Sequence, residues 1–306
     1  MSKDKDKTSP LINKKILIVG SIIIIIGIIL IGISPQSRID SLTNKIIGKT
    51  QPSQDNMEFI TFLEGQQKNL TVSNKDLLFN ITITYDKTKN PEYVNVEKKS
   101  EFADFYKQVG FTDMSKDVVF IYPIFTQGAY SNHGFYDYYE KKCGVECLTI
   151  PIPTKFVPMY GASMTTTMVL SLLNYSYITD IDVDKNPDIL KKYHKVIILH
   201  NEYVTKKEFD AITNHPNVVY LFANSLYAEV KTDYTNNTIT LVRGHGYPTP
   251  SITNGFDWKF DNSKFEYNIN CENLTLDVIP NGKMLNCYPA YHALFDKPFL
   301  ETIKKS

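Results

Sequence analysis

The sequence has no excess of charge of either sign. Its 306 residues contain 33 Lys and Arg against 33 Asp and Glu, so the formal net charge is zero. This balance excludes nucleic-acid binding through a broad basic surface. The chain also lacks a glycine-rich phosphate loop and a dinucleotide fingerprint, so a nucleotide cofactor is not indicated. Hydrophobic residues make up 42% and charged residues 22%, a composition typical of a globular chain.

Charge is also missing from one long N-terminal stretch. Residues 16–33 are apolar apart from three glycines and one serine. As a helix they would cover roughly 27 Å, close to the hydrocarbon thickness of a bilayer. The stretch predicts a transmembrane helix over residues 16–36, with the lipid bilayer as its partner. A cleaved signal peptide is the alternative, but Ser34-Pro35-Gln36 is a poor match to a small-residue cleavage site.

The flanking cations give this helix a direction. Five lysines precede the apolar stretch, whereas three cations follow it within a similar distance. The excess on the N-terminal side predicts a cytoplasmic N-terminus and an extracytoplasmic C-terminal domain, in a single-pass protein of the cell membrane.

Cysteines are few, and all four follow the apolar stretch. The even number in an outward-facing domain favours two local disulfides, Cys143–Cys147 and Cys271–Cys287. A metal site is the weaker alternative, because the second pair lacks zinc-ribbon spacing. Five N-x-S/T sequons give weak additional support for exposure to the outside, and they begin at Asn69, Asn80, Asn174, Asn236 and Asn273.

The pattern of the remaining chain predicts an α/β fold with antiparallel β additions. Continuous apolar runs of the kind found in strands buried on both faces alternate with helical segments, which indicates a parallel sheet. These runs are Val118–Tyr122, Cys147–Ile152, Lys195–His200 and Asn217–Phe222, with a further strand at Ile178–Val183. The expected parts are a cytoplasmic tail (1–15), the transmembrane helix (16–36), a tether (37–56), a β-rich extension (57–116), the α/β core (117–243) and a loop-rich C-terminal extension (244–306).

Polar side chains follow three of these predicted strands. Thr126 and Tyr130 come after the first, His200 and Glu202 after a later one, and the segment 224–227 after the next. Because ligands of parallel sheets bind beyond the carboxyl ends of the strands, we expect a site at this edge. Thr126, Asn224 and Ser225 are the residues expected to bind the substrate.

Three short motifs in the core resemble one known family. They are T-x-x-A-Y-x-N at residues 126–132, H-x-E-Y at 200–203 and A-N-S-L-Y at 223–227. This part of the chain is similar to the C-terminal domain of N,N-dimethylformamidase large subunits, a relative of class I glutamine amidotransferases. The resemblance implies a flavodoxin-like or class I glutamine-amidotransferase-like sheet. It also implies a mononuclear iron held by one tyrosine and two glutamates.

By motif position, Tyr130 and Glu202 match two of the iron ligands of that family. The third ligand has no motif, and Glu266 is the candidate, with Glu272 as a second choice. One phenolate and two carboxylates suit a hard cation such as ferric iron, which would activate water and polarise an amide carbonyl. His200 or His133 would then move a proton.

A nucleophilic mechanism has less support from the residues. No cysteine stands at a strand end in the glycine-flanked setting that a nucleophile elbow needs, and Ser225 also lacks flanking glycines. The sequence therefore predicts a metal-assisted hydrolase of amide or related C–N bonds. The alternative is a non-catalytic surface module that binds glycans or envelope proteins. It stays open because Gln127 and Val204 stand where family members carry tryptophan.

Overall fold

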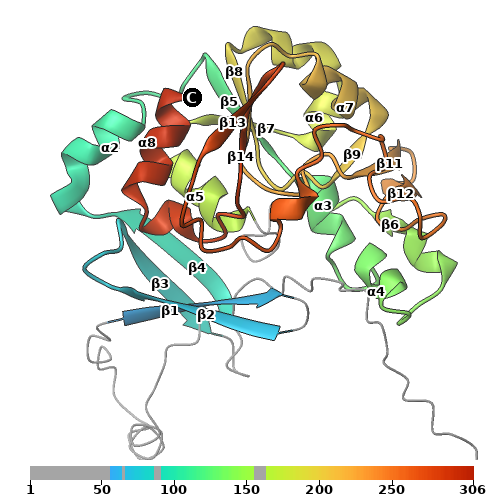
Figure 1. Cartoon of the computed structure of the whole chain (residues 1–306), viewed down its shortest axis with the longest axis horizontal. Coiled ribbons are helices and arrows are strands. Elements are labelled where there is room, and N and C mark those ends of the chain that lie inside the picture. Colours follow the sequence, from blue (N-terminus) through green and yellow to red (C-terminus); the bar gives the residue numbers. More distant parts are fainter. Residues whose placement is uncertain (1–55, 64–65, 86–90, 155–162) are drawn as a thin grey trace, which may run out of the picture.

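A six-stranded sheet forms the centre of the molecule (Figure 1). The computed structural model describes residues 56–63, 66–85, 91–154 and 163–306. The strand order of this sheet is β13-β14-β10-β8-β5-β7, and all neighbours run parallel except β13, which is antiparallel to β14. The strands are β5 (Val118–Tyr122), β7 (Ser176–Thr179), β8 (Lys195–Ile198), β10 (Val218–Tyr220), β13 (Leu276–Ile279) and β14 (Gly282–Leu285).

Alternate residues of the parallel strands supply two separate cores. Phe120, Ile197 and Val219 face one side, where they pack with α5, α8 and the N-terminal hairpins. Val196 and Val218 face the opposite side, where they pack with α6, η3 and α7. Burial on both faces explains why these strands are continuous apolar runs. The helical elements on the two sides are α2 (Ala103–Val109), α5 (Met164–Leu172), α6 (Asp180–Lys185), η3 (Pro187–Lys192), α7 (Lys206–Thr213) and α8 (Lys297–Lys305).

A second sheet of four strands lies beside the first, in the order β6-β12-β11-β9. Its strands are β6 (Thr149–Pro151), β9 (Tyr203–Thr205), β11 (Ala228–Asp233) and β12 (Thr238–Arg243). The predicted strand at Cys147–Ile152 is therefore only partly correct. Its central residues form β6, which is antiparallel to β12 and lies outside the parallel sheet, and it follows the 3-10 helix η2 (Val145–Leu148).

Two antiparallel hairpins precede the central sheet in the chain. They are β1 (Asn56–Leu63) with β2 (Gln66–Ser73), and β3 (Phe79–Tyr85) with β4 (Pro91–Lys98). The buried rings of Phe59 and Phe79 join these hairpins to the core that contains α8. The remaining short elements are η1 (Ser100–Phe102), α3 (Ile124–Ala129), α4 (Phe135–Tyr139), η4 (Ser263–Phe265) and η5 (His292–Leu294).

The predicted strand at Ile178–Val183 is wrong in its second half. The strand β7 ends at Thr179, whose side chain accepts a hydrogen bond from the Asp182 amide while the Asp182 carboxylate accepts one from the Thr179 amide. This reciprocal capping box begins helix α6 directly after the strand.

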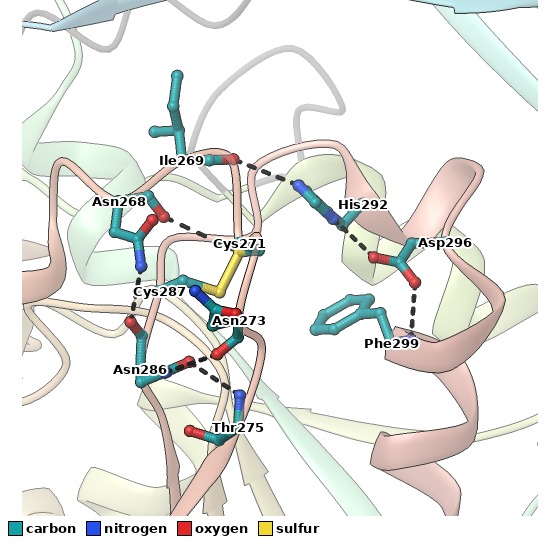
Figure 2. The surroundings of a disulfide bond; sticks show 10 residues. All are labelled: Asn268, Ile269, Cys271, Asn273, Thr275, Asn286, Cys287, His292, Asp296 and Phe299. Atoms are coloured by element: carbon teal, nitrogen blue, oxygen red, sulfur yellow. Dashed lines mark hydrogen bonds and ion pairs between the residues drawn. A yellow bond between two sulfur atoms is a disulfide. The ribbon is translucent and has the colours of Figure 1, made fainter.

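Both predicted disulfides are present, Cys143–Cys147 and Cys271–Cys287. Figure 2 shows how hydrogen bonds reinforce the second one. The Asn286 side chain donates to the Asn273 carbonyl over 2.8 Å and accepts from the Thr275 amide over 2.9 Å, which closes the loop between the two cysteines. Two disulfides are typical of proteins of oxidising compartments.

The predicted fold class, a parallel sheet with antiparallel β additions behind one transmembrane helix, is contradicted. The described residues form a mixed α/β structure with several separate sheets. Within residues 56–63, 66–85, 91–154 and 163–306, no helix has the length and apolar character needed to cross a membrane. The predicted transmembrane helix at 16–36 lies outside the described residues. The bilayer partner and the cell-membrane location that depended on this helix are likewise not supported.

Candidate functional site

The candidate site lies where the strand order of the parallel sheet reverses. Counted along the chain, the five parallel strands have the order 2-1-3-4-5, so the reversal falls between β5 and β8. Crevices at such reversals bind ligands at the carboxyl ends of the strands. Beyond β5 the chain continues into α3 and Tyr130, and beyond β8 it continues into His200 and Glu202.

Glu202 is the centre of this site. Its side chain is 0% exposed, and its carboxyl group accepts hydrogen bonds from two phenols. The Tyr130 Oη lies 2.8 Å from Oε2, and the Tyr136 Oη lies 3.0 Å from Oε1 and 3.2 Å from Oε2. The two phenol oxygens are 2.7 Å apart and their rings stack at 4.1 Å. The three groups therefore form one continuous hydrogen-bonded cluster.

The surroundings of Glu202 favour its neutral form. Burial, together with the nearby charge of Glu266, raises the pKa of its carboxyl from 4.5 to about 8, against the lowering effect of the hydrogen bonds from Tyr130 and Tyr136. Burial also raises the pKa of both phenols well above the usual 10, and the charge of Glu202 acts in the same direction. At neutral pH the cluster thus consists of a carboxylic acid and two protonated phenols.

His200 lies on the Oε2 side of the carboxyl, with its Nε2 atom 3.8 Å away. Its side chain is 1% exposed, and neither ring nitrogen has a hydrogen-bond partner among the described residues. Burial lowers the pKa of the imidazole to about 3, so the ring is neutral. An unpaired buried polar group is costly, so these two nitrogens are free to bind a substrate that enters the site.

A buried carboxyl behind the site holds the two loops that carry its residues. Asp180 accepts hydrogen bonds from the Phe125 amide over 2.8 Å and from the Asn201 side chain over 2.6 Å. The first partner lies in the first turn of α3, and the second directly precedes Glu202. Burial raises the pKa of Asp180 to about 7, against the lowering effect of the hydrogen bonds from Phe125 and Asn201.

The structure gathers some of the other predicted site residues and leaves others outside. Glu266 is half-buried and close enough to raise the pKa of Glu202. Burial raises the pKa of Glu266 itself to about 7, and a hydrogen bond from Asn224 lowers it. His133 is exposed, its amide donates to the Asp137 carboxylate over 2.6 Å, and it has no described contact with Glu202.

Thr126 and Ser225 are buried at the strand ends but already hydrogen-bonded to the protein. Thr126 Oγ1 accepts from the Tyr203 amide over 3.2 Å. Ser225 Oγ donates to the carbonyls of Leu199 and Phe222, at 3.0 and 2.8 Å. A hydroxyl held between two carbonyls is not activated for attack, so Ser225 has no geometry of a nucleophile.

The predicted metal-binding property is contradicted. In the part of the chain that the structure describes, no group of three or more His, Cys, Asp or Glu side chains is placed to hold a metal ion. Of the predicted ligands, Tyr130 and Glu202 are hydrogen-bonded to each other, and Glu202 is also bonded by Tyr136. No step of the chemistry below is routed through a metal.

Two important residues were missed as site residues by the sequence reasoning. Tyr136 lies in α4, six residues after Tyr130, and no pattern distinguishes it from its tyrosine neighbours in this aromatic segment. The loop of residues 243–248 that carries His245 was interpreted as a plain turn, and an approach of His245 to the site was the weaker alternative. Its Nε2 atom is 3.8 Å from Glu202 Oε1 and 3.4 Å from Tyr136 Oη. Its position between two glycines was the available signal.

Comparison with known proteins agrees with the motifs at the strand ends. No curated protein matches the chain. The profile of one protein family matches residues 96–261, which are more than half of the 306 residues and include β5, β8 and Glu202. The chain therefore belongs to the family described as N,N-dimethylformamidase beta subunit-like, C-terminal.

Proposed function

We propose that the chain is a hydrolase of small, uncharged amides or related non-peptide C–N bonds, with Glu202 as its general acid and base. The observation that carries the proposal is the carboxyl of Glu202, fully buried at the carboxyl end of β8 and bonded by two phenols. The family name supports the class of substrate, because it names the hydrolysis of a small amide.

The reaction uses Glu202 twice. When a substrate enters, the hydroxyls of Tyr130 and Tyr136 turn from Glu202 to its carbonyl oxygen, and their hydrogen bonds stabilise the negative charge that develops there. A water molecule adds to the carbonyl carbon, and the nitrogen takes a proton from the Glu202 carboxyl as the C–N bond breaks. The carboxylate regains a proton from the attacking water. The products are a carboxylic acid and an amine, and water supplies both the hydroxyl and the proton.

The raised pKa of Glu202, about 8, suits these two roles. An acid–base group works best when its pKa lies near the pH of the reaction, since both protonation states are then accessible. The two free nitrogens of His200, next to Oε2, would orient the substrate or the water.

We also infer a relationship to class I glutamine amidotransferases, together with the large-subunit assignment within the family. The parallel strand order 2-1-3-4-5 supports the relationship, because it is the flavodoxin-like order of doubly wound sheets. The proposed chemistry nevertheless differs from that of glutaminases, since the hydroxyl of Ser225 is already bonded to two carbonyls.

Turnover of small amides by the purified chain tests the proposed function. Formamide, acetamide and N,N-dimethylformamide are supplied, and the release of ammonia or amine is measured. Glu202→Gln should reduce kcat on the order of 100-fold or more, since it removes the acid–base group. Tyr130→Phe removes one hydrogen bond and should have a smaller effect. The matched control is Glu101→Gln, because Glu101 is exposed and has no predicted role in the site.

Two results would overturn the proposal. Full activity of Glu202→Gln would show that the carboxyl takes no part. A wild-type chain that hydrolyses none of the amides, together with a partner that still binds Glu202→Gln, would favour the non-catalytic binding module. Iron, the cofactor that the resemblance implies, stays a prediction, and elemental analysis of the same preparation tests it.

A further inference from the structure

Tyr288 contributes an unpaired hydroxyl to the interior of the candidate site. The residue is 2% exposed, and among the described residues its Oη atom has no hydrogen-bond partner. Burial raises the pKa of this phenol well above 10, and the charges of Glu266 and Glu202 raise it further, so the hydroxyl lies near both carboxyls. A buried hydroxyl without a partner is costly, which indicates that its partner is a molecule that enters the site.

The rings around Tyr288 place this hydroxyl beside groups that the proposed reaction uses. The Tyr288 ring meets the His200 ring edge to face, with centroids 5.7 Å apart and an interplanar angle of 83°. The His200 ring in turn lies 6.0 Å from the Tyr130 ring. Phe222 packs edge to face against Tyr288 at 5.3 Å. Aromatic contacts therefore hold Tyr288 next to His200, whose two ring nitrogens are also unpaired within the described part of the chain.

The disulfide Cys271–Cys287 fixes the backbone that carries Tyr288 (Figure 2). Tyr288 directly follows Cys287, and its amide donates to the Asn268 carbonyl over 2.9 Å. The Asn268 side chain donates to the Asn286 carbonyl over 3.1 Å, so the two sides of the stapled loop are joined next to Tyr288. A group whose position is fixed before the ligand arrives loses little entropy on binding, which favours selection among ligands.

The family profile does not include this residue. It matches residues 96–261, so His200 and Glu202 lie inside it and Tyr288 lies beyond it, in the C-terminal extension. The extension thus adds a polar contact to the site that the family name does not describe.

The proposed reaction leaves one polar group of the substrate for this hydroxyl. An amide offers a carbonyl oxygen and, unless its nitrogen is fully substituted, an N–H. In the proposed reaction the carbonyl oxygen is bound by Tyr130 and Tyr136. The N–H still needs an acceptor, and a phenol oxygen accepts hydrogen bonds as well as donating them. An N,N-dialkyl amide has no N–H and would leave the hydroxyl of Tyr288 unpaired.

We propose that Tyr288 Oη accepts a hydrogen bond from the amide N–H of the substrate, so that the chain selects amides with at least one N–H over N,N-dialkyl amides. This inference rests on the proposed function and names its substrate class. A site built to bond an N–H discriminates against an analogue that lacks it, because its buried polar group is then left without a partner. Tyr288 is a specificity-determining residue, and no covalent bond forms or breaks at it.

The selectivity between N-methylformamide and N,N-dimethylformamide tests the proposal, because the second amide carries a methyl group in place of the N–H. The ratio of the two kcat/KM values is measured for the wild type and for Tyr288→Phe, which keeps the ring and removes the hydroxyl. The preference for N-methylformamide should fall roughly 3–10-fold in the variant, the effect of losing one hydrogen bond. A ratio cancels any change in the fraction of active protein.

Thermal denaturation gives a second measurement, without substrate. Tyr288→Phe removes an unpaired buried hydroxyl, so Tm should rise by roughly 3 °C. The matched control is Tyr175→Phe. Tyr175 is also buried, but it lies at the amino-terminal end of β7, and its hydroxyl donates to the Val109 carbonyl over 2.8 Å. This control should have a lower Tm and an unchanged selectivity ratio.

An unchanged ratio in an active Tyr288→Phe overturns the inference and leaves the proposed function intact, and a lower Tm of this variant overturns the inference as well. If the wild type hydrolyses neither amide, the proposed function fails, and the dissociation constants of both amides are measured by ligand-observed NMR titration. A preference for N-methylformamide that Tyr288→Phe removes would then still support the contact. Binding of neither amide, or equal preference in both proteins, would overturn it.

Discussion

Glu202→Gln should make the protein more stable at neutral and alkaline pH while it removes activity. Burial raises the pKa of Glu202 from 4.5 to about 8. The folded protein therefore keeps a proton that the unfolded chain releases above pH 4.5. Stability contributed by the neutral carboxyl is complete below pH 4.5, falls as the pH rises to about 8, and is constant above that value. Glutamine has nearly the same shape and no charge, so the variant does not lose this stability as the pH rises.

The size of the effect follows from the two pKa values. The interval between 4.5 and about 8, at about 1.4 kcal/mol for each pKa unit, corresponds to about 5 kcal/mol above pH 8. At pH 7 only the pH range above the unfolded pKa of 4.5 and up to pH 7 contributes, so the expected gain in the free energy of unfolding is about 3 kcal/mol. For a chain of this size a gain of 1 kcal/mol raises Tm by about 2–4 °C, so Tm should rise by roughly 10 °C at pH 8.

Thermal and urea denaturation from pH 4 to pH 9 measure this difference. The two proteins should be equally stable at pH 4, and the advantage of Glu202→Gln should grow steadily up to pH 8. Substitution of the exposed Glu101 by glutamine is the control, and this variant should follow the wild type at each pH. A stability difference that is independent of pH, or a variant less stable than the wild type at pH 8, would refute the reasoning.

Three further predictions concern the support of the site. Glu208→Gln should flatten the loss of stability as the pH rises above 4.5 in urea denaturation, because burial beside a second carboxyl raises the Glu208 pKa and makes its ionised form costly. Replacing Cys271 and Cys287 together by serine should lower the free energy of unfolding by about 3 kcal/mol, the value for a loop of this length, measured in urea. Gly244→Ala should destabilise the protein more than Gly246→Ala in thermal denaturation. Both substitutions carry a strain of about 1–2 kcal/mol from positive φ, but only the first also creates a steric clash, with the Cα of Ala228 in β11. Equal effects of the two alanines would contradict the close approach at β11.

The sequence predicted best where burial leaves a continuous apolar run. Val118–Tyr122 and Lys195–Ile198 are strands of the parallel sheet, because both of their faces are covered. The run Cys147–Ile152 has the same character, yet its central residues pair with β12 in a different sheet. A hydrophobic run reports burial and does not identify the partner strand. The strand β2 (Gln66–Ser73) was missed because it is mostly polar and contains no continuous apolar run.

The candidate site could be predicted only where a strand end brings its residues together. Tyr130 and Glu202 follow β5 and β8, which are neighbours in the sheet, so their proximity follows from a parallel arrangement. His245 reaches the same carboxyl from a loop after β12, and its approach depends on the second sheet packing beside the first. No local pattern contains that information.

The position of β14 and α8 has a consequence for how the chain folds during synthesis. Both elements come after the α/β core in the sequence, but β14 pairs with β10 and α8 packs in the core shared with the N-terminal hairpins. The Leu78 amide, between those hairpins, donates to the carbonyl of Leu294 over 2.8 Å. Elements made first thus remain without part of their core until residues more than 200 positions later are available. Such long-range contacts slow folding and leave apolar surface exposed for longer, so we expect the nascent chain to need protection from aggregation.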